Sequence, residues 1–446
     1  MYTRFVSNIL FPLHERLKKH DSVAVLKELE ASQWWSSEEI EQHRLRKLRA
    51  FLQFAQKNVP YYQRIFKEYS FNPCIESLNA LSQLPILEKS HIRANVDEFK
   101  SVCAGELKRS NTGGSSGEPL VFFMGRGRIS HDVAAKWRAT RWWGVDIGDK
   151  EVVVWGSPIE LGAQDKVRMI RDRLLRTTLL PAFEMSDEKL SQFVSDIRVF
   201  KPKMLFGYPS SLSLIARYAR DQGLVLGDLG IKVAFVTSER LYDDQRAIIS
   251  EVFACPVANG YGGRDAGFLA HECPHGGMHI SAEDIIVETV GSEGAPVAKG
   301  EVGEVVVTHL ASHDFPFIRY RTGDMAVLDD AQCGCGRGLP MLKEIQGRTT
   351  DFIIAANGTV MHGLALIYIL RDLPEVGLFK IIQESLDKTR VLIVPAAGFT
   401  QEMIAKIKED FRRRLGEAVQ VDVELVERIP REKNGKFRYV VSKVAA

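Results

Sequence analysis

The chain has 446 residues, which is too long for one compact domain and indicates two or three. Apolar residues make up 45% and charged residues 26%, ordinary values for a globular protein, and a formal net charge of +2 does not favour nucleic acid as a partner. Six cysteines are few for this length, and three cluster with histidines, which favours reduced thiols, a metal site and a cytoplasmic location over a disulfide framework.

The N-terminal segment is apolar and then amphipathic. Residues 1–10 are apolar but carry Arg4 and lack a small-residue cleavage site, which argues against a signal peptide. No stretch approaches the run of about 18 apolar residues that a membrane-spanning helix needs. Residues 11–20 are expected to form a packed helix, with attachment to a membrane surface as the alternative. The basic residues of this amphipathic stretch are Arg16, Lys18 and Lys19.

Apolar residues then recur at helical spacing, so we expect residues 1–100 to form a helical N-terminal region. Beyond Lys108, strand-like runs alternate with helical stretches. The runs are Glu151–Gly156, Lys203–Gly207, Ile231–Thr237 and Gly303–Leu310. Ser186 is expected to cap a helix that extends to Phe200. This alternation predicts an α/β fold with a largely parallel sheet.

The last hundred residues predict a small α+β unit. The expected strands and helices are Asp351–Ala355, His362–Asp372 (helix), Leu378–Glu384, Thr389–Pro395, Thr400–Gly416 (helix) and Val419–Val426. The boundary is placed near Gly347–Thr350. The sequence thus predicts a large α/β domain over residues 1–347 and a smaller α+β domain over residues 348–446.

Five motifs carry the functional signal. The first is Asn111–Pro119, whose three glycines allow close approach of the backbone to a ligand and whose hydroxyls and N–H groups could hold phosphate oxygens. It is no Walker A loop, because no Gly-Lys-Ser/Thr follows, and a flexible turn is the alternative. The second is Asn259–Asp265, where Tyr261 could face a purine and Asp265 could bind Mg²⁺; a turn with a packed tyrosine is the alternative.

The third motif is Arg319–Asp324, in which the carboxylate could accept hydrogen bonds from ribose hydroxyls; a surface turn with local ion pairs is the alternative. The fourth is Gly347–Asp351, at the expected boundary. The fifth is Pro430–Lys436, although a lysine in such a tail is usually only solvated. In this order and spacing the five motifs resemble the adenylate-forming superfamily of acyl-CoA synthetases, adenylation domains and luciferases.

Within that superfamily the chain is most similar to the phenylacetate–CoA ligase family, near the branch with capsular-polysaccharide biosynthesis proteins and coenzyme F390 synthetase. The runs Lys201–Pro202, Gly207–Ser210 and Thr237–Glu239 also resemble that branch, and the likeness extends from about Ile40 to the C-terminus. It implies a large α/β domain with a smaller mobile α+β cap. It also implies that ATP activates a carboxylic acid as an acyl-adenylate, after which the acyl group passes to a thiol, with coenzyme A as the expected acceptor.

The resemblance also implies roles for individual residues. Lys436 stands at the position of the catalytic lysine, and Asp265 at that of a Mg²⁺-binding acidic residue. The residues expected to bind ATP or AMP are Thr112, Gly113, Gly114, Ser115, Ser116, Gly117, Ser238, Glu239, Tyr261, Gly262, Asp324 and Arg348. Three departures from the family pattern stand out: Glu118 replaces a common lysine, Asp265 is shorter than the usual glutamate, and Thr350 occupies the usual hinge position.

Two alternatives remain beside this function. Acyl or adenylyl transfer to another acceptor, in polysaccharide or secondary metabolism, shares the first half-reaction. A non-catalytic nucleotide-binding scaffold would account for Glu118 and Thr350. The acid is not specified by the sequence: Trp155, Phe206 and Tyr208 could line its pocket or belong to the core. The oligomeric state is equally open, with a homodimer as one candidate.

A cysteine–histidine cluster predicts a structural zinc site. Cys333 and Cys335 lie in a polar, glycine-rich loop, and Cys273 lies upstream among three histidines. Three sulfurs and one imidazole would complete a tetrahedral site, and His279 matches similar clusters in the resembled family best, with His271 and His275 as alternatives. Reduced thiols in a tight turn are the alternative. The sequence neighbours of two further cysteines, Cys103 and Cys255, suggest core thiols.

Overall fold

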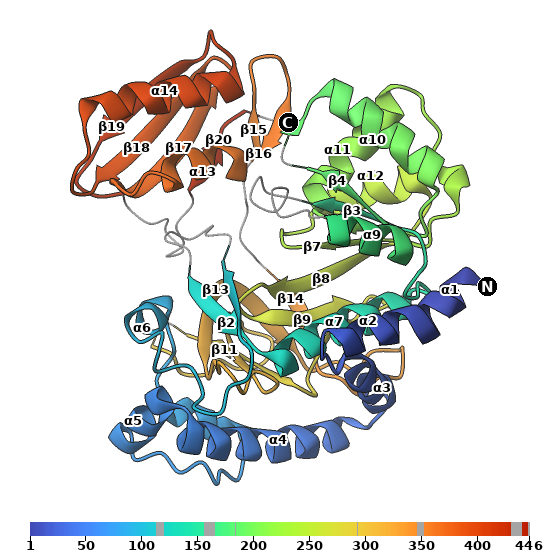
Figure 1. The fold of residues 1–446 in the computed structure, drawn as a ribbon, viewed down its shortest axis with the longest axis vertical. Helices are drawn as coiled ribbons and strands as arrows, with labels where there is room; N and C mark the ends of the chain where they lie inside the picture. Colours follow the sequence, from blue (N-terminus) through green and yellow to red (C-terminus); the bar gives the residue numbers. More distant parts are fainter. Residues whose placement is uncertain are drawn as a thin grey trace.

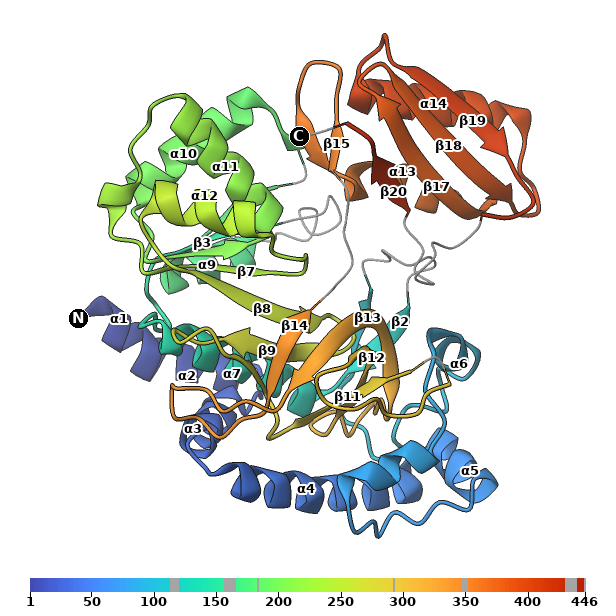
Figure 2. The same cartoon turned by 180° about the vertical axis from the view of Figure 1, so that it is seen from behind.

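The computed structural model describes residues 1–112, 120–155, 166–182, 184–291, 293–345, 352–429 and 439–444. Figures 1 and 2 show N-terminal helices at the bottom, a long twisted sheet above them, and, at the top, the helices of residues 187–253 on one side and the C-terminal unit on the other. No described helix is long and apolar enough to cross a membrane.

Helices dominate the N-terminal region, as expected. They are α1 (Tyr2–Phe5), the π-helical turn η1 (Val6–Leu10), α2 (Phe11–Leu17), α3 (Ser22–Ser32), α4 (Ser37–Asn58), α5 (Pro60–Glu68), the 3₁₀ turn η2 (Leu78–Gln83) and α6 (Lys89–Ala94). Ser36 starts α4 with a capping box, because its hydroxyl accepts from the Glu39 N–H while the Glu39 carboxylate accepts from the Ser36 N–H. The apolar face of α4 then packs on the antiparallel half of the sheet through Phe51 and Leu52.

Within the described part of the chain, eleven strands form the central sheet, in the order β11-β12-β13-β14-β10-β9-β8-β7-β6-β3-β4. The parallel half comprises β4 (Thr177–Pro181), β3 (Glu151–Trp155), β6 (Met204–Gly207), β7 (Val233–Thr237) and β8 (Val257–Gly263). The antiparallel half comprises β9 (Gly267–Glu272), β10 (Met278–Ile280), β14 (Met341–Ile345), β13 (Tyr320–Asp329), β12 (Val302–His309) and β11 (Ile285–Val290). All four sequence-predicted runs form strands of this sheet.

Helices cover both faces of the parallel half. One layer is α10 (Asp187–Phe200), α11 (Pro209–Asp221) and α12 (Asp243–Phe253), with the 3₁₀ turn η3 (Gly227–Leu229); the other is α7 (Arg126–Trp142) and α9 (Lys166–Leu175). In β6, Leu205 packs against the first layer while Met204 and Phe206 face the second. This burial on both sides explains why the strand is a continuous apolar run. The Ser186 hydroxyl caps α10 as predicted.

The C-terminal unit has the predicted α+β composition. Its elements are β15 (Phe352–Ile354), β16 (Val360–His362), α13 (Leu364–Arg371), β17 (Val376–Ser385), β18 (Lys388–Pro395), α14 (Gln401–Leu415), β19 (Gln420–Leu425) and β20 (Val440–Ser442). Four of the strands form a sheet in the order β19-β18-β17-β20. The hairpin β15–β16 instead pairs with the short strand β5 (Glu184–Met185) of the body. The domain boundary at residue 347 lies outside the described residues and stays a prediction.

Two smaller expectations about the cysteines differ in outcome. Cys255 is buried, and burial raises the pKa of its thiol to about 12, as befits a core thiol. The same expectation for Cys103 is wrong, because its side chain is exposed. It lies in a surface turn whose apolar neighbour, Val102, is exposed as well, so the local sequence gave a misleading signal.

Candidate functional site

The candidate site lies where three parallel strands of the sheet end. Open α/β sheets bind ligands at the carboxyl ends of such strands. Ser238 and Glu239 follow β7, and Ser210 follows β6 at the start of α11. The Ser210 hydroxyl donates a hydrogen bond to the Glu239 carboxylate, which joins the two loops that the sequence suggested separately. Ser238 has φ = +74°, an unfavourable value for a residue with a side chain and one that often marks a binding site.

Tyr261 and Gly262 lie on the neighbouring strand, β8. The register of β8 against β9 shifts between these two residues. A Cβ atom on Gly262 would lie 2.3 Å from the carbonyl oxygen of Gly267, so this irregularity requires glycine. The turn that follows presents Asp265, half-buried, at the end of the strand.

Two tyrosine–aspartate pairs link β8 and its turn to β13. The Tyr261 hydroxyl donates to Asp324 Oδ2 at 3.1 Å, and the Tyr320 hydroxyl donates to Asp265 Oδ2. The second and third motifs, about sixty residues apart in sequence, therefore meet: each contributes one tyrosine and one aspartate, and each tyrosine donates to the aspartate of the other motif. Tyr261 is only 9% exposed and its ring joins an apolar cluster, so its hydroxyl contact is the defined feature and stacking on a purine stays a prediction.

The third motif is not a surface turn, so that alternative is wrong. Its first residue, Arg319, is 2% exposed and donates to the carbonyl oxygens of Leu84 and Gly294 while pairing with Glu288. The rest of the motif lies in β13. The guanidinium thus ties the start of this strand to the N-terminal region, and Asp324 projects from a well-anchored strand.

The glycine-rich motif connects a hairpin. Strands β1 (Lys108–Asn111) and β2 (Val121–Met124) pair antiparallel, and the Thr112 N–H donates to the Leu120 carbonyl at 3.0 Å while the Leu120 N–H donates to the Thr112 hydroxyl at 2.9 Å. Arg264, next to Asp265, donates to the Asn111 carbonyl. The base of the hairpin is therefore held beside the Asp265 turn.

Several expected site residues lie outside the described part of the chain. They are Gly113, Gly114, Ser115, Ser116 and Gly117, the substituted positions Glu118 and Thr350, Arg348, and Lys436. Their roles stay predictions.

A buried polar network beneath the Asp265 turn escaped sequence analysis. Arg128 of α7 donates to the carbonyl oxygens of Arg264 and Asp265 and pairs with Asp132 at 3.0 Å. Burial, with Arg128 as the next cause, lowers the pKa of the adjacent His309 to about 3, so its imidazole is neutral at pH 7. No short sequence motif predicts this network, because its residues come together only when α7 packs on the sheet.

The three aromatic residues considered for a substrate pocket do meet. The Trp155 ring stacks on Tyr208 with centroids 4.4 Å apart, and Phe206 lies next in the row at 6.1 Å. Phe206 and Tyr208 are buried, whereas Trp155, which stacks on both, is half-buried at the carboxyl end of β3.

The cysteine–histidine cluster assembles as predicted. Cys273 Sγ lies 3.6 Å from Cys333 Sγ, and Cys335 Sγ lies 3.2 Å from His279 Nε2, with all four ligand atoms within 4.8 Å of one another. Zn–S bonds of about 2.3 Å in a tetrahedron place sulfurs about 3.8 Å apart, close to the observed separation. His279 Nδ1 faces the Leu339 carbonyl at 3.4 Å, which leaves Nε2 as the nitrogen that points to the sulfurs.

The two alternative histidines do not join the four-residue cluster. His271 is fully buried and stacks on Phe268, and burial lowers its pKa to about 3. His275 lies near the same loops but not among the four converging ligands. The backbone also leaves space for the sulfurs, since a Cβ on Gly277 would lie 2.7 Å from Cys333 Sγ.

Comparison with known proteins places this geometry in context. Residues 353–443 match the family of the CapK C-terminal domain. Protein CapK of Staphylococcus aureus is 26% identical, over 88% of this chain and 87% of that protein. Phenylacetate-coenzyme A ligase of Thermus thermophilus is 23% identical, over 90% of this chain and 95% of that enzyme.

Among solved structures, 2-hydroxyisobutyryl-CoA ligase in complex with 2-HIB-AMP and CoA matches with a TM-score of 0.65 and 22% identity, over 91% of this chain and 90% of that one. The expected fold, a large α/β body with a smaller C-terminal α+β unit, is confirmed. The chain thus has the fold of the adenylate-forming CoA ligases, is similar over most of its length to CapK and phenylacetate–coenzyme A ligases, and matches the CapK C-terminal domain family in residues 353–443.

Proposed function

We propose that this protein is an AMP-forming acid–thiol ligase. A carboxylate oxygen of the acid attacks the α-phosphorus of ATP, the bond to the β-phosphate oxygen breaks and pyrophosphate leaves. The thiol sulfur of coenzyme A then attacks the acyl carbonyl, and AMP leaves. The observation that supports this most is the convergence of Asp324, Asp265 and the base of the glycine-rich hairpin at the carboxyl edge of the sheet. The relatives named phenylacetate-coenzyme A ligase support the same chemistry.

The proposed roles follow from charge and position. Asp324, oriented by the Tyr261 hydroxyl, would accept hydrogen bonds from the ribose hydroxyls. Asp265, oriented by Tyr320, offers the carboxylate oxygen that Mg²⁺ prefers, and Mg²⁺ would offset the charge on the departing pyrophosphate. Thr112 and the glycines after it would hold the β- and γ-phosphates. Ser238 and Glu239 would line the nucleotide pocket.

Lys436 is proposed as the catalytic residue for a simple electrostatic reason. The attacking carboxylate and the α-phosphate are both negative, so a cation between them offsets their repulsion and stabilises the pentacoordinate transition state. No general base is needed, because the acid is already ionised at neutral pH. The position lies between β19 and β20, and β20 returns to pair with β17.

ATP–pyrophosphate exchange across a panel of carboxylic acids tests the proposal and identifies the acid. Lys436→Ala should lower exchange by at least about 100-fold, or roughly 3 kcal/mol, while ATP binding changes little. Lys433→Ala, in the same motif, is the matched control and should stay near wild type. Wild-type rates in Lys436→Ala would refute the catalytic assignment, and nucleotide binding without exchange for any acid would favour a non-catalytic scaffold.

A different acyl acceptor is the second candidate. The match of residues 353–443 to the CapK C-terminal domain and the similarity to protein CapK favour it, because neither name specifies coenzyme A as the acceptor. Product analysis by mass spectrometry separates the two: acyl-CoA formed with AMP supports the first candidate. Accumulated acyl-adenylate that coenzyme A does not discharge would support another nucleophile, such as a sugar amine or a carrier thiol.

We also propose that Cys273, His279, Cys333 and Cys335 hold a structural zinc ion. Four protein ligands leave no position for water, so the ion would stabilise the loops and take no part in catalysis. Elemental analysis of protein purified without added metal should give about one equivalent of zinc, lost in Cys335→Ser but kept in Cys103→Ser. Less than about a tenth of an equivalent in wild type, with freely titratable thiols, would mean that these residues form only a cysteine-bearing turn.

A further inference from the structure

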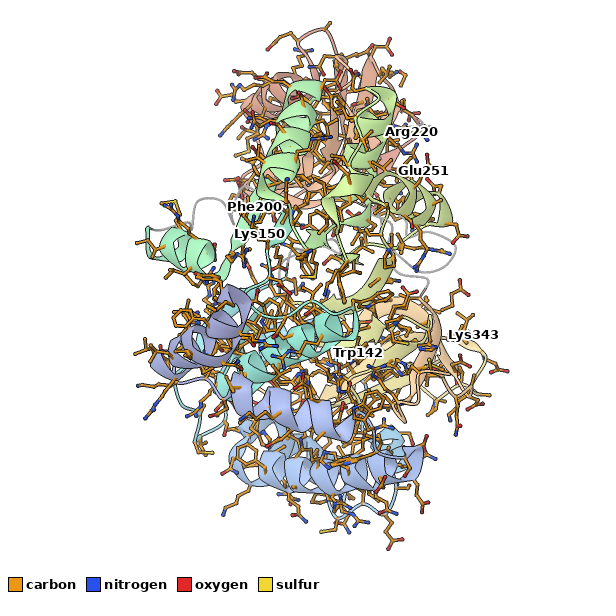
Figure 3. All side chains as sticks on the ribbon, turned by 90° about the vertical axis from the view of Figure 1, so that its right-hand side faces the viewer. Trp142, Lys150, Phe200, Arg220, Glu251 and Lys343 are labelled. Carbon is orange, nitrogen blue, oxygen red and sulfur yellow. The ribbon has the colours of Figure 1, made fainter. Side chains whose placement is uncertain are left out.

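A large share of the exposed apolar side chains gathers on one edge of the molecule. Nine of the nineteen large hydrophobic residues exposed in the described chain lie in two short segments. They are Met1, Tyr2, Phe5, Ile9, Leu13 and Leu17 in the N-terminal helices, and Met169, Ile170 and Leu174 in α9. The Tyr2 hydroxyl donates to the Leu174 carbonyl, so the segments are neighbours, and Figure 3 shows them on the same edge. We name these nine side chains the apolar face.

The N-terminal helices are already packed on their other side. Val6 and Phe11 are buried against α3 and α7, in a cluster with Leu26 and Leu29. The helix is therefore apolar on two sides, which is typical of a helix that has a second apolar environment besides the protein core.

Helical geometry aligns the outer residues. Phe5, Ile9, Leu13 and Leu17 are spaced by four, a spacing that drifts around a regular α-helix of 3.6 residues per turn. The π-helical turn at Val6–Leu10 holds more residues per turn and offsets part of this drift. The four side chains thus stay on one stripe, with exposed fractions between 47% and 76%. Such π turns are frequent at functional sites.

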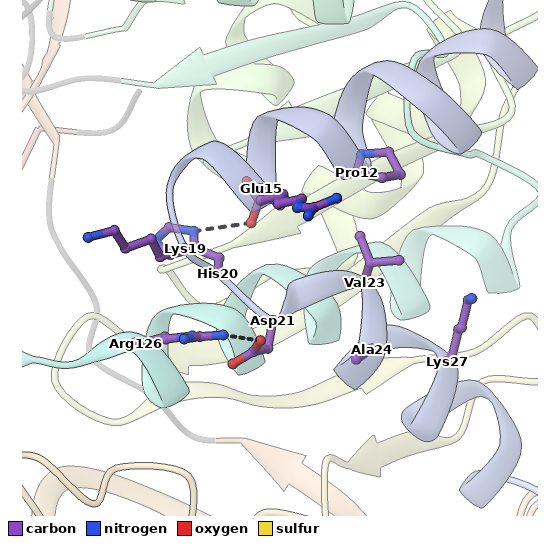
Figure 4. A pocket seen from close by; sticks show the side chains of 10 residues that line it. Pro12, Glu15, Lys19, His20, Asp21, Val23, Ala24, Lys27 and Arg126 are labelled. Carbon is purple, nitrogen blue, oxygen red and sulfur yellow. Dashed lines mark hydrogen bonds and ion pairs between the residues drawn. The ribbon is translucent and has the colours of Figure 1, made fainter. Parts of the chain in front are cut away.

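Positive charge is concentrated in the two segments that carry the apolar face. Residues 1–19 and 166–176 together contain nine Lys and Arg residues but only two acidic residues. The rest of the chain has 50 Lys and Arg residues and 55 acidic residues, so the basic excess lies in these two segments. Burial, with the nearby Arg171 and Lys108 as further causes, lowers the pKa of Lys18, so cations crowd here. A pocket of about 400 Å³ on the polar side of α2 continues this surface, and the structure describes no carboxylate partner for Arg16, Lys19 or Lys27 of its lining (Figure 4).

We propose that the apolar face and its basic rim attach this protein to the surface of an anionic membrane. The helices would lie in the plane of the interface, with the apolar side chains among the acyl chains and the Lys and Arg side chains at the lipid phosphates. A second copy fits less well, because a two-fold interface would set the same basic rim against itself. Acidic lipid headgroups supply the charge that this surface lacks.

Vesicle flotation tests the proposal with the full-length protein. Vesicles of phosphatidylcholine with about 30% phosphatidylglycerol should bind the protein, whereas pure phosphatidylcholine vesicles should bind at least tenfold less. Raising the salt concentration from about 0.1 M to about 0.5 M should release most of it. Absence of binding to the anionic vesicles at low salt would overturn the proposal.

Substitutions locate the contact. The double variant Ile9→Glu/Leu13→Glu should lose at least tenfold in partitioning, and Lys18→Glu/Lys19→Glu, which leaves the apolar side chains intact, should lose several-fold. Val199→Glu/Leu224→Glu, with both positions exposed elsewhere, is the matched control and should bind as wild type. Equal loss in the control would overturn the proposal. A wild-type dimer in light scattering that Ile9→Glu/Leu13→Glu converts to monomer would instead assign the face to a second copy.

Discussion

The Tyr261–Asp324 contact permits a sharp test of how the nucleotide is held. Tyr261→Phe removes one hydroxyl and nothing else, because the ring, 9% exposed, keeps its packing in the apolar cluster. Asp324 then loses the donor that lies 3.1 Å from its Oδ2 atom. If this carboxylate receives the ribose hydroxyls, the variant should bind ATP more weakly while its folding stability changes little.

The magnitude follows from the type of bond. A hydrogen bond to a charged acceptor contributes about 1.5–3 kcal/mol, and because Asp324 is only half-buried, water should compensate part of the loss. We therefore expect about 1–1.5 kcal/mol, or a roughly tenfold higher Kd for ATP. Isothermal titration with a non-hydrolysable ATP analogue measures it directly.

The companion variant Tyr320→Phe provides the control. It removes the same group from Asp265, so it should raise the Mg²⁺ concentration needed for half-maximal exchange and leave metal-free nucleotide binding nearly unchanged. If Tyr261→Phe leaves the Kd for ATP unchanged, or if both variants shift only the Mg²⁺ requirement, Asp324 is not the ribose acceptor.

Three further predictions concern stability and the site. Gly262→Ala should lower the melting temperature and exchange activity together, because its Cβ would lie 2.3 Å from the Gly267 carbonyl oxygen; a neutral result by calorimetry would contradict the need for glycine here. Cys335→Ala should lower the melting temperature more than it lowers activity per folded molecule, and the reverse pattern would argue against a structural metal. Burial lowers the pKa values of His271 and His309 to about 3, so below about pH 6.5 the unfolded chain binds protons that the folded chain does not. The free energy of unfolding should therefore fall as the pH drops from about 6.5, by up to ~1.4 kcal/mol per pH unit for each histidine. Equal denaturation midpoints at pH 7 and pH 5 would refute this prediction.

The sequence by itself determined the local elements and the fold class. Continuous apolar runs such as Met204–Gly207 became strands buried on both faces, and Ser186 capped the helix that starts at Asp187, because patterning and capping act over a few residues. The spacing of Cys273, Cys333 and Cys335 was equally informative, since few other reasons gather thiols and imidazoles in two polar loops.

Only the tertiary structure decided how distant residues meet. The pairing of Tyr261 with Asp324, and the buried network of Arg128 beneath the Asp265 turn, join segments more than sixty residues apart. The choice of His279 over His271 depended on position in the sheet, because the two are cross-strand partners on β10 and β9 and only His279 lies beside the cysteine loops. Such contacts depend on sheet order and helix packing, which involve the whole chain, whereas propensity and periodicity describe only the residues beside one another.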